Sequence, residues 1–190
     1  MRFLQDLISW SIAFLVALCA GFCLHLVFFS LYVVDGHSMM PTLQHGDLVL
    51  VDTFTYSHLH APKRGDIVAL AVPGDPSFRF VKRVIGVGGD SVRIAGGHVY
   101  VNGQTLGTED YILEPPMDDF DEVQVPSGTV FVLGDNRNNS EDSRFDDVGF
   151  VPTSLILGHA ICVLWPGFDA GSLLLPADTP LLHVPQKGDI

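Results

Sequence analysis

The apolar positions of this chain form one long run at the N-terminus and many short runs after it. Apolar residues dominate from Leu7 to Val34, about 28 positions, whereas a helix needs only about 20 to cross a bilayer. A cleaved signal peptide would have a shorter apolar region of about 7–15 residues, ending at a small-x-small site. The long run therefore predicts an uncut membrane anchor over residues 1–34, in contact with the lipid bilayer.

The charges around the long run predict its orientation. Arg2 precedes the run, and no Lys or Arg follows it until Lys63. Basic residues favour the cytoplasmic side of a membrane. We therefore expect a single-pass protein of the cell membrane, with a cytoplasmic N-terminus and its body on the extracytoplasmic face.

Beyond Val34 the apolar runs become short and are separated by Gly, Pro, Asn and Asp. Such runs around tight glycine turns are typical of β-hairpins, and no later segment has a long 3.6-residue periodicity. The runs predict strands over Asp47–Asp52, Asp66–Val72, Phe78–Val87, Ser91–Ile94, His98–Val101, Val130–Leu133 and Leu157–Trp165. We expect a mostly β body of hairpins and antiparallel sheets over residues 35–168, followed by a loosely ordered, Pro-rich tail over residues 169–190.

One predicted strand carries a lysine among apolar residues. Alternate residues of a strand share a face, so Lys82 lies on the same face as Phe80 and Val84. Burial there would lower the pKa of the amine from about 10.4 toward about 7–8, where it can act as a general base. A surface lysine that extends its charged end into water is the competing interpretation.

A serine and a polar loop supply the partners that such a base needs. Ser38 follows the turn-like segment Asp35-Gly36-His37, and a Ser hydroxyl becomes an effective nucleophile when a base removes its proton. A Ser/Lys pair is a known solution for acyl transfer. The loop Gly134–Arg144 offers hydroxyl groups and one ion pair: Ser140, Ser143, and Asp142 with Arg144.

Four segments resemble, in order and spacing, the conserved boxes of bacterial type I signal peptidases. They are SMMPTLQHGDLVLVD (Ser38–Asp52), RGDIV (Arg64–Val68), FVKRVIGVGGD (Phe80–Asp90) and GDNRNNSEDSRF…GFVP (Gly134–Pro152). With the similar N-terminal anchor, the resemblance covers about residues 7–165. It implies a signal-peptidase-like β body and a serine endopeptidase that removes signal peptides from secretory preproteins after small-x-small sites, without a cofactor.

The resemblance assigns a role to each matching residue. Ser38 is similar in position to the family's nucleophile, and Lys82 to its general base. Ser140 matches the hydroxyl that positions the lysine, while Asp142 and Arg144 match the ion pair that supports the site. The backbone N–H of Ser38 matches the oxyanion-hole donor.

The resemblance also implies how the substrate binds. An extended segment would add a strand to an exposed edge beside Ser38, with small residues at −1 and −3 in shallow apolar pockets. The expected lining residues are Val34, Met39, Leu43, Phe80 and Val81. Ordinary core packing explains each of them equally well. Three positions depart from the family pattern: Gly36, where some members carry a second oxyanion donor, Gly88 and Asn138.

Charge and histidine content limit the other functions. The net charge is −12, and nucleic acid binding needs a basic surface, so no nucleic acid partner is expected. The acidic residues between Glu109 and Glu122 meet no base within that segment, which is typical of a solvated loop. His58 and His60 form a weak metal motif without Cys, and no metal site is predicted.

Two rival functions share features with this sequence. An inactive, membrane-tethered β domain would bind extended peptides without cutting them, but the presence of both Ser38 and Lys82 favours catalysis. A self-cleaving repressor uses a similar Ser/Lys pair. It would also need a DNA-binding helical domain and a cleavable linker, and neither is visible in the sequence.

Overall fold

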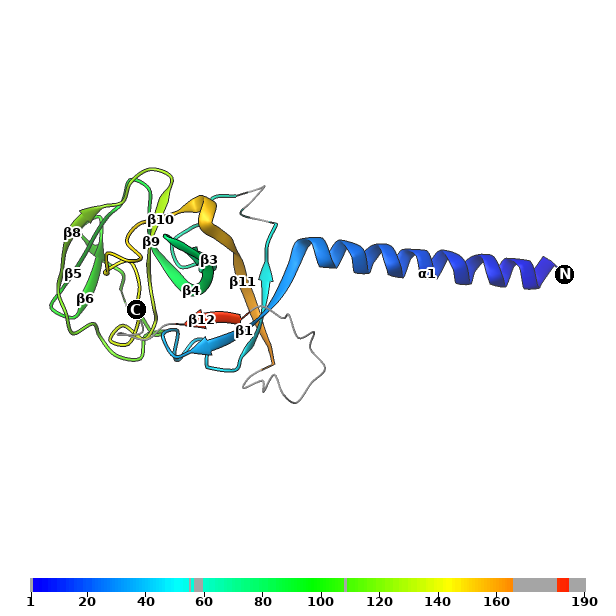
Figure 1. The fold of residues 1–190 in the computed structure, drawn as a ribbon, viewed down its shortest axis with the longest axis horizontal. Helices are drawn as coiled ribbons and strands as arrows, with labels where there is room; N and C mark the ends of the chain where they lie inside the picture. The colour runs from blue at the N-terminus through cyan, green and yellow to red at the C-terminus, as the bar shows by residue number, and fades with distance from the viewer. Residues whose placement is uncertain (1, 55, 57–59, 108, 166–180, 185–190) are drawn as a thin grey trace.

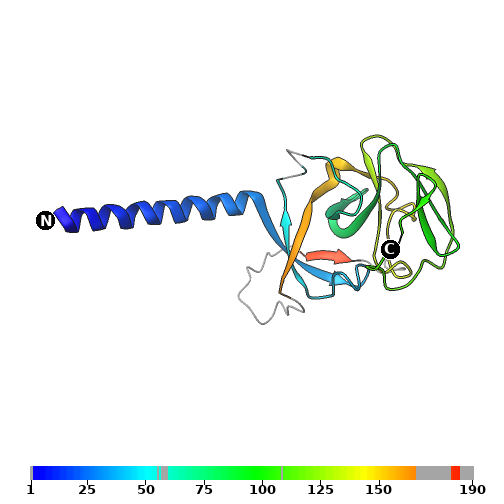
Figure 2. The same ribbon diagram turned by 180° about the vertical axis from the view of Figure 1, so that it is seen from behind.

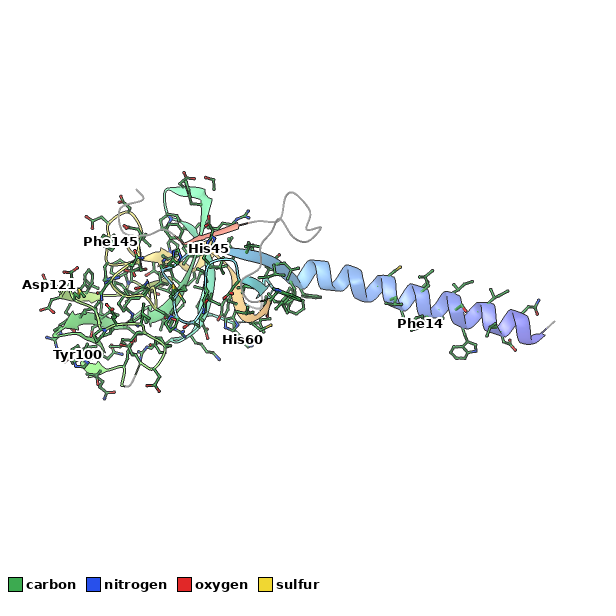
Figure 3. The ribbon with its side chains drawn as sticks, turned by 90° about the horizontal axis from the view of Figure 1, so that it is seen from below. Phe14, His45, His60, Tyr100, Asp121 and Phe145 are labelled. Carbon is green, nitrogen blue, oxygen red and sulfur yellow. The ribbon has the colours of Figure 1, made fainter. Side chains whose placement is uncertain are left out.

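The structure, a computed structural model, describes residues 2–54, 56, 60–107, 109–165 and 181–184. The side chains of residues 2–4, 22–27, 76 and 181–184 are outside this description. A long helix, α1 (Arg2–Phe28), extends from a β body, as Figure 1 shows. Figure 3 shows Phe14 on this helix, well away from the body.

The N-terminal segment differs from the prediction in two ways. The helix ends at Phe28, before the predicted anchor boundary at residue 34, and the apolar run continues as strand β1 (Phe29–Gly36). Phe29–Gly36 is rich in aromatic and β-branched residues, which favour strands. Within the described residues, no helix combines the length and hydropathy that a bilayer crossing requires, so the predicted membrane span is not confirmed.

The body is mostly β, as predicted, and is built from two sheets. The larger sheet has the strand order β10-β9-β4-β3-β11-β2-β1-β12, and the smaller has the order β7-β6-β5-β8. The remaining strands are β2 (Leu48–Asp52), β3 (Ile67–Val72), β4 (Asp75–Val87), β5 (Ser91–Ala95), β6 (His98–Val101), β7 (Gln104–Thr105), β8 (Phe120–Gln124), β9 (Thr129–Leu133), β10 (Val151–Pro152), β11 (Ile156–Trp165) and β12 (Leu181–Val184). Each strand predicted from the sequence is present, with bounds that differ by a few residues.

Tight turns join the strands that the glycine pattern predicted as hairpins. Strands β5 and β6 are antiparallel, with Ala95 opposite His98 across Gly96-Gly97. Both of these glycines have positive φ, the backbone region that such turns require. The small sheet that they form lies at the end of the body farthest from α1 (Figure 1), where Figure 3 labels Tyr100 and Asp121.

Strand β4 is the central element for the site because it pairs on both sides. It is antiparallel to β3, with Lys82 opposite Val68, and antiparallel to β9, with Val84 opposite Val132. Side chains on both faces of β4 are buried here, since the consecutive residues Val81 and Lys82 are both buried, as are Val84 and Ile85. Phe80 and Val84 accordingly pack in a fully buried cluster with residues of β3 and β9.

The predicted loosely ordered tail contains a strand. Leu181–Val184 forms β12, which pairs in parallel with β1, so Val34 lies opposite Leu182 and Gly36 opposite Val184. The other residues of the 169–190 tail lie outside the described residues. A four-residue strand between prolines gives almost no periodic signal, and the sequence pattern missed it for that reason.

Candidate active site

Ser38 lies in the turn that follows β1, where two features fix the backbone. Gly36 has a φ of 123°, a region that favours glycine, and it turns the chain out of the strand. Asn136 then donates its backbone N–H to the carbonyl of Ser38 at 2.9 Å and its side-chain amide to the carbonyl of His37 at 3.1 Å. The serine is therefore held on a constrained loop and not on a free one.

Lys82 lies in the middle of β4 and reaches Ser38. Its Nζ donates a hydrogen bond to Ser38 Oγ at 2.5 Å, and both residues have an exposed fraction of 0%. Burial disfavours the charged amine and lowers the pKa of Lys82 to about 8, although the carboxylate of Asp142 opposes the shift. The surface-lysine interpretation is wrong, because this amine has no contact with solvent.

Asp142 is the centre of the polar loop Gly134–Arg144. Its Oδ2 accepts hydrogen bonds from Ser140 Oγ at 2.7 Å and from the N–H of Gly134 at 3.0 Å. Arg144 donates to both carboxylate oxygens, at 2.8 and 2.9 Å, so the predicted Asp142–Arg144 ion pair is present. Burial alone would raise the pKa of Asp142, but Arg144 and the other donors outweigh it and lower the pKa.

Gly134 brings this loop close to Ser38. A Cβ at this position would overlap Ser140 Oγ on one side and the carbonyl oxygen of Ser38 on the other. Only glycine allows these two serines to lie so close to the same backbone atom. Ser140 thus lies beside the Ser38 turn, and its hydroxyl is directed to Asp142. Its assignment as the group that positions Lys82 stays a prediction.

The comparison with known families identifies the family of this chain. A model of the family described as "Signal peptidase, peptidase S26" matches residues 7–165. The chain belongs to the signal peptidase family. It is accordingly a serine peptidase, a hydrolase of the signal peptidase I type.

Named relatives of this signal peptidase family are close in sequence. "Probable signal peptidase I-1" of Synechocystis sp. is 44% identical over 147 residues, covering 74% of this chain and 73% of the relative. "Signal peptidase I S" of Bacillus subtilis is 35% identical over 173 residues, covering 85% and 91%. A crystal structure of a signal peptidase I from Enterococcus faecalis V583 is 32% identical, with a TM-score of 0.46 over 54% of this chain and 98% of that one.

Beside the Ser/Lys pair, the structure reveals a polar cluster that sequence reasoning missed. Arg83, the neighbour of Lys82, points to the opposite face of β4 and donates to Asp135 at 2.6 and 2.8 Å. Asp135 also accepts a hydrogen bond from Thr42 at 2.5 Å. This cluster joins β4, the segment after Ser38 and the Gly134 loop. The only feature of the sequence that pointed to this cluster was the alternation of the strand, which places Arg83 and Lys82 on opposite faces.

The acidic segment of this family member is not simply a solvated loop. Glu109 accepts a hydrogen bond from Arg137 at 2.5 Å, and both side chains are buried. Asn138 donates to the carbonyl of Pro115 at 3.0 Å and accepts from the N–H of Met117 at 2.9 Å. The acidic segment is therefore hydrogen-bonded to the loop Gly134–Arg144, and Asn138 makes two of these hydrogen bonds.

The expected pocket residues are all buried. Val34, Met39, Leu43 and Val81 pack in one cluster that joins the strands and turn around Ser38, and Phe80 belongs to the neighbouring cluster. This arrangement places them beside the site. It is equally the packing of an ordinary core, so their role as pocket lining stays a prediction.

The histidines do not form a metal centre in the part of the chain that the structure describes. His37 and His45 stack with ring centroids 5.8 Å apart, next to Ser38. No group of three or more metal-binding side chains occurs among the described residues. His58, half of the motif considered from the sequence, lies outside the described residues.

Proposed function

We propose that this signal peptidase cleaves secretory preproteins with Ser38 as the nucleophile and neutral Lys82 as the general base. The observation that carries the proposal is the 2.5 Å hydrogen bond between Lys82 Nζ and Ser38 Oγ, made where neither side chain contacts solvent. Proton transfer from Ser38 Oγ to Lys82 Nζ requires that the two atoms lie within hydrogen-bond distance. A pKa of about 8 keeps a substantial fraction of the Lys82 amine neutral near pH 7–8.

In the first half of the reaction, Ser38 Oγ attacks the carbonyl carbon of the scissile peptide bond. The hydroxyl proton moves to Lys82 Nζ, which becomes an ammonium, and the carbonyl oxygen becomes an oxyanion. Lys82 then gives this proton to the leaving nitrogen. The C–N bond breaks, the mature protein leaves with a free amine, and the signal peptide remains as an ester on Ser38.

In the second half, a water molecule attacks the ester. Lys82 takes a proton from the water and returns it to Ser38 Oγ as the C–O bond breaks, which restores the starting state. The negative oxygen in both halves is stabilised by the backbone N–H of Ser38. Gly36 has no side-chain donor, so this oxyanion hole depends on backbone groups.

Asp142 and Arg144 support this chemistry through their charges and their rigidity. The buried Asp142 carboxylate stabilises the ammonium that forms on Lys82, because it raises the pKa of the amine against burial. Arg144 neutralises Asp142 and has the reverse effect on Lys82. The pair therefore holds the amine near a pKa at which it can both accept and return a proton.

The substrate binds as an extended strand at the edge of β1, which ends at the Ser38 turn. The backbone supplies the affinity, and the apolar residues around the turn, Val34, Met39, Leu43, Phe80 and Val81, form shallow pockets that admit small residues at −1 and −3. The preference for small-x-small sites follows from the size of those pockets.

The enzyme works at a membrane, with α1 as its attachment. Trp10, Phe14 and Leu15 of this helix are exposed in the structure, and a row of large apolar side chains without protein cover favours lipid. The cytoplasmic N-terminus and extracytoplasmic body follow from Arg2 and the late first lysine. Flotation with liposomes, compared between the full chain and a Trp10→Glu/Phe14→Glu variant, tests the attachment.

Incubation of the detergent-solubilised protein with a secretory precursor tests the activity. Mass spectrometry should find a single cut after a small-x-small site. Ser38→Ala and Lys82→Met should each lower the rate by a factor of about 10³ or more. The exposed residues Ser127 and Lys63 provide matched controls, and Ser127→Ala and Lys63→Met should cleave normally. Tight binding of the precursor without a cut would instead support the peptide-binding β domain.

A further inference from the structure

Strand β12 covers the edge of β1 to which a substrate strand is expected to add. β1 pairs with β2 on one side, and β12 pairs with it on the other and forms the outer strand of the large sheet. Figures 1 and 2 both show β12 between β1 and the β3–β4 pair, and β12 also lies against β4, which carries Lys82. A preprotein strand and β12 cannot occupy this edge together.

The direction of β12 is the direction that a substrate needs. It runs parallel to β1, and its last residue, Val184, lies opposite Gly36, two positions before Ser38. A substrate peptide in this register would pair with β1 up to the position of Val184. The residues that follow this position would lie next to Ser38. The segment Leu181–Val184 therefore occupies the edge of β1 in the same chain direction as the one expected for a substrate.

We propose that Leu181–Val184 is an intramolecular occupant of the substrate-binding edge and competes with preproteins. This inference rests on the proposed function for the identity of the competitor. Because the segment belongs to the same chain, its competition does not depend on the concentration of the enzyme. A preprotein binds only when β12 leaves, so the apparent affinity is reduced by the fraction of molecules in which the edge is free.

The sequence around β12 is suited to a segment that a preprotein can displace and that the enzyme does not cleave. Residues 180–187, PLLHVPQK, contain no Ala, Gly or Ser, so they lack the small-x-small pattern that the enzyme is proposed to require. Pro180 and Pro185 flank the strand, and a proline has no N–H to extend a ladder. Pairing is thus limited to a few backbone hydrogen bonds, each worth about 1 kcal/mol.

The test uses the full chain with the double substitution Leu182→Pro/His183→Pro. Alternate residues of a strand direct their N–H groups to the same edge, so two consecutive prolines remove a bond to β1 whichever residue makes it. The control is Leu182→Ala/His183→Ala, which keeps both N–H groups. We expect the proline variant to show a KM for a preprotein that is lower by about three- to tenfold, with kcat unchanged, while the alanine variant matches the wild type.

A binding measurement separates this inference from the proposed function. A fluorescent peptide with the sequence of residues 178–187, DTPLLHVPQK, should bind the proline variant about three- to tenfold more tightly than the wild-type chain, and a scrambled peptide should bind neither. If no form of the protein cleaves any precursor, the proposed function fails. The peptide measurement still shows whether Leu181–Val184 blocks the edge of β1. Equal KM values, or equal peptide binding by wild type and proline variant, would overturn the inference.

Discussion

Asn136 holds the peptide that carries Ser38, since its backbone N–H is bonded to the carbonyl of Ser38 at 2.9 Å. Its side-chain amide bonds the preceding carbonyl, that of His37, at 3.1 Å. The same turn presents both the hydroxyl and the backbone N–H that the proposed reaction uses. Asn136 therefore holds the backbone on which the hydroxyl and the N–H of Ser38 are placed, and its own hydrogen bonds go to the two carbonyl groups.

Substitution Asn136→Ala removes the bond to His37 and leaves the backbone bond in place. A neutral hydrogen bond is worth about 1 kcal/mol, so we expect kcat to fall by about five- to tenfold with little change in KM. Steady-state kinetics on a preprotein measures this. Asn138→Ala is the control, because Asn138 bonds the acidic segment and not the Ser38 turn. Equal loss in both variants would contradict the role given to Asn136.

The charges around Lys82 predict opposite shifts in the pH dependence of cleavage. Burial is the main cause of its lowered pKa, Arg144 lowers it further, and Glu141 raises it. Arg144→Met should therefore move the rise in rate to higher pH, and Glu141→Gln should move it to lower pH. Arg144→Lys keeps the charge and should shift the profile less than Arg144→Met. Profiles of kcat/KM from pH 6 to 10 measure the shifts, and shifts in the same direction would contradict this electrostatic account.

The buried pair Arg137–Glu109 should be needed for stability. Arg137→Met leaves the buried carboxylate of Glu109 without its cation, which costs about 3–5 kcal/mol in comparable sites. Urea unfolding at constant m-value measures the loss. The double variant Arg137→Met/Glu109→Gln should recover part of it, because the remaining side chain is neutral. A double variant less stable than Arg137→Met alone would show that the stability does not come from the charge pairing.

Lys82 should reduce stability at neutral pH, although it is the proposed general base. Its pKa falls from 10.5 to about 8 in the folded state, so the unfolded chain holds the proton more tightly. The cost is full below pH 8, declines between pH 8 and 10.5, and disappears above 10.5. The shift corresponds to roughly 3 kcal/mol, and the lost bond to Ser38 offsets part of it, so Lys82→Met should gain about 1–2 kcal/mol at pH 7. Urea unfolding at pH 7 and pH 10.5 tests this, and an equal gain at both values would contradict it.

The sequence predicted the elements whose pattern is local. Turns such as Gly96-Gly97 marked the hairpins, and the strand that carries Lys82 was visible from the alternation around it. Ser38 and Lys82 are separated by 44 positions, so their contact came from the resemblance of four ordered segments to a family. Alternation alone left a surface lysine open as an alternative.

The features that the sequence did not predict depend on distant contacts. A continuous apolar run is compatible with a helix or a buried strand, so the change from α1 to β1 at Phe29 gave no signal. Glu109 and Arg137 are 28 positions apart, and nothing near Glu109 indicates its cation. Strand β12 exists through its pairing with β1, a tertiary interaction that overrides its weak local propensity.

The dependence of kcat/KM on pH tests the central claim most directly, because it reports the pKa of the essential base in the free enzyme. Neutral Lys82 is the proposed active form, so the rate on a secretory precursor should rise about tenfold per pH unit below the pKa and level off above about pH 8. The matched Lys63→Met variant should give the same curve. A flat profile from pH 6 to 10, or a Lys82→Met variant with near-normal turnover, would contradict the assignment of Lys82 as the base for Ser38.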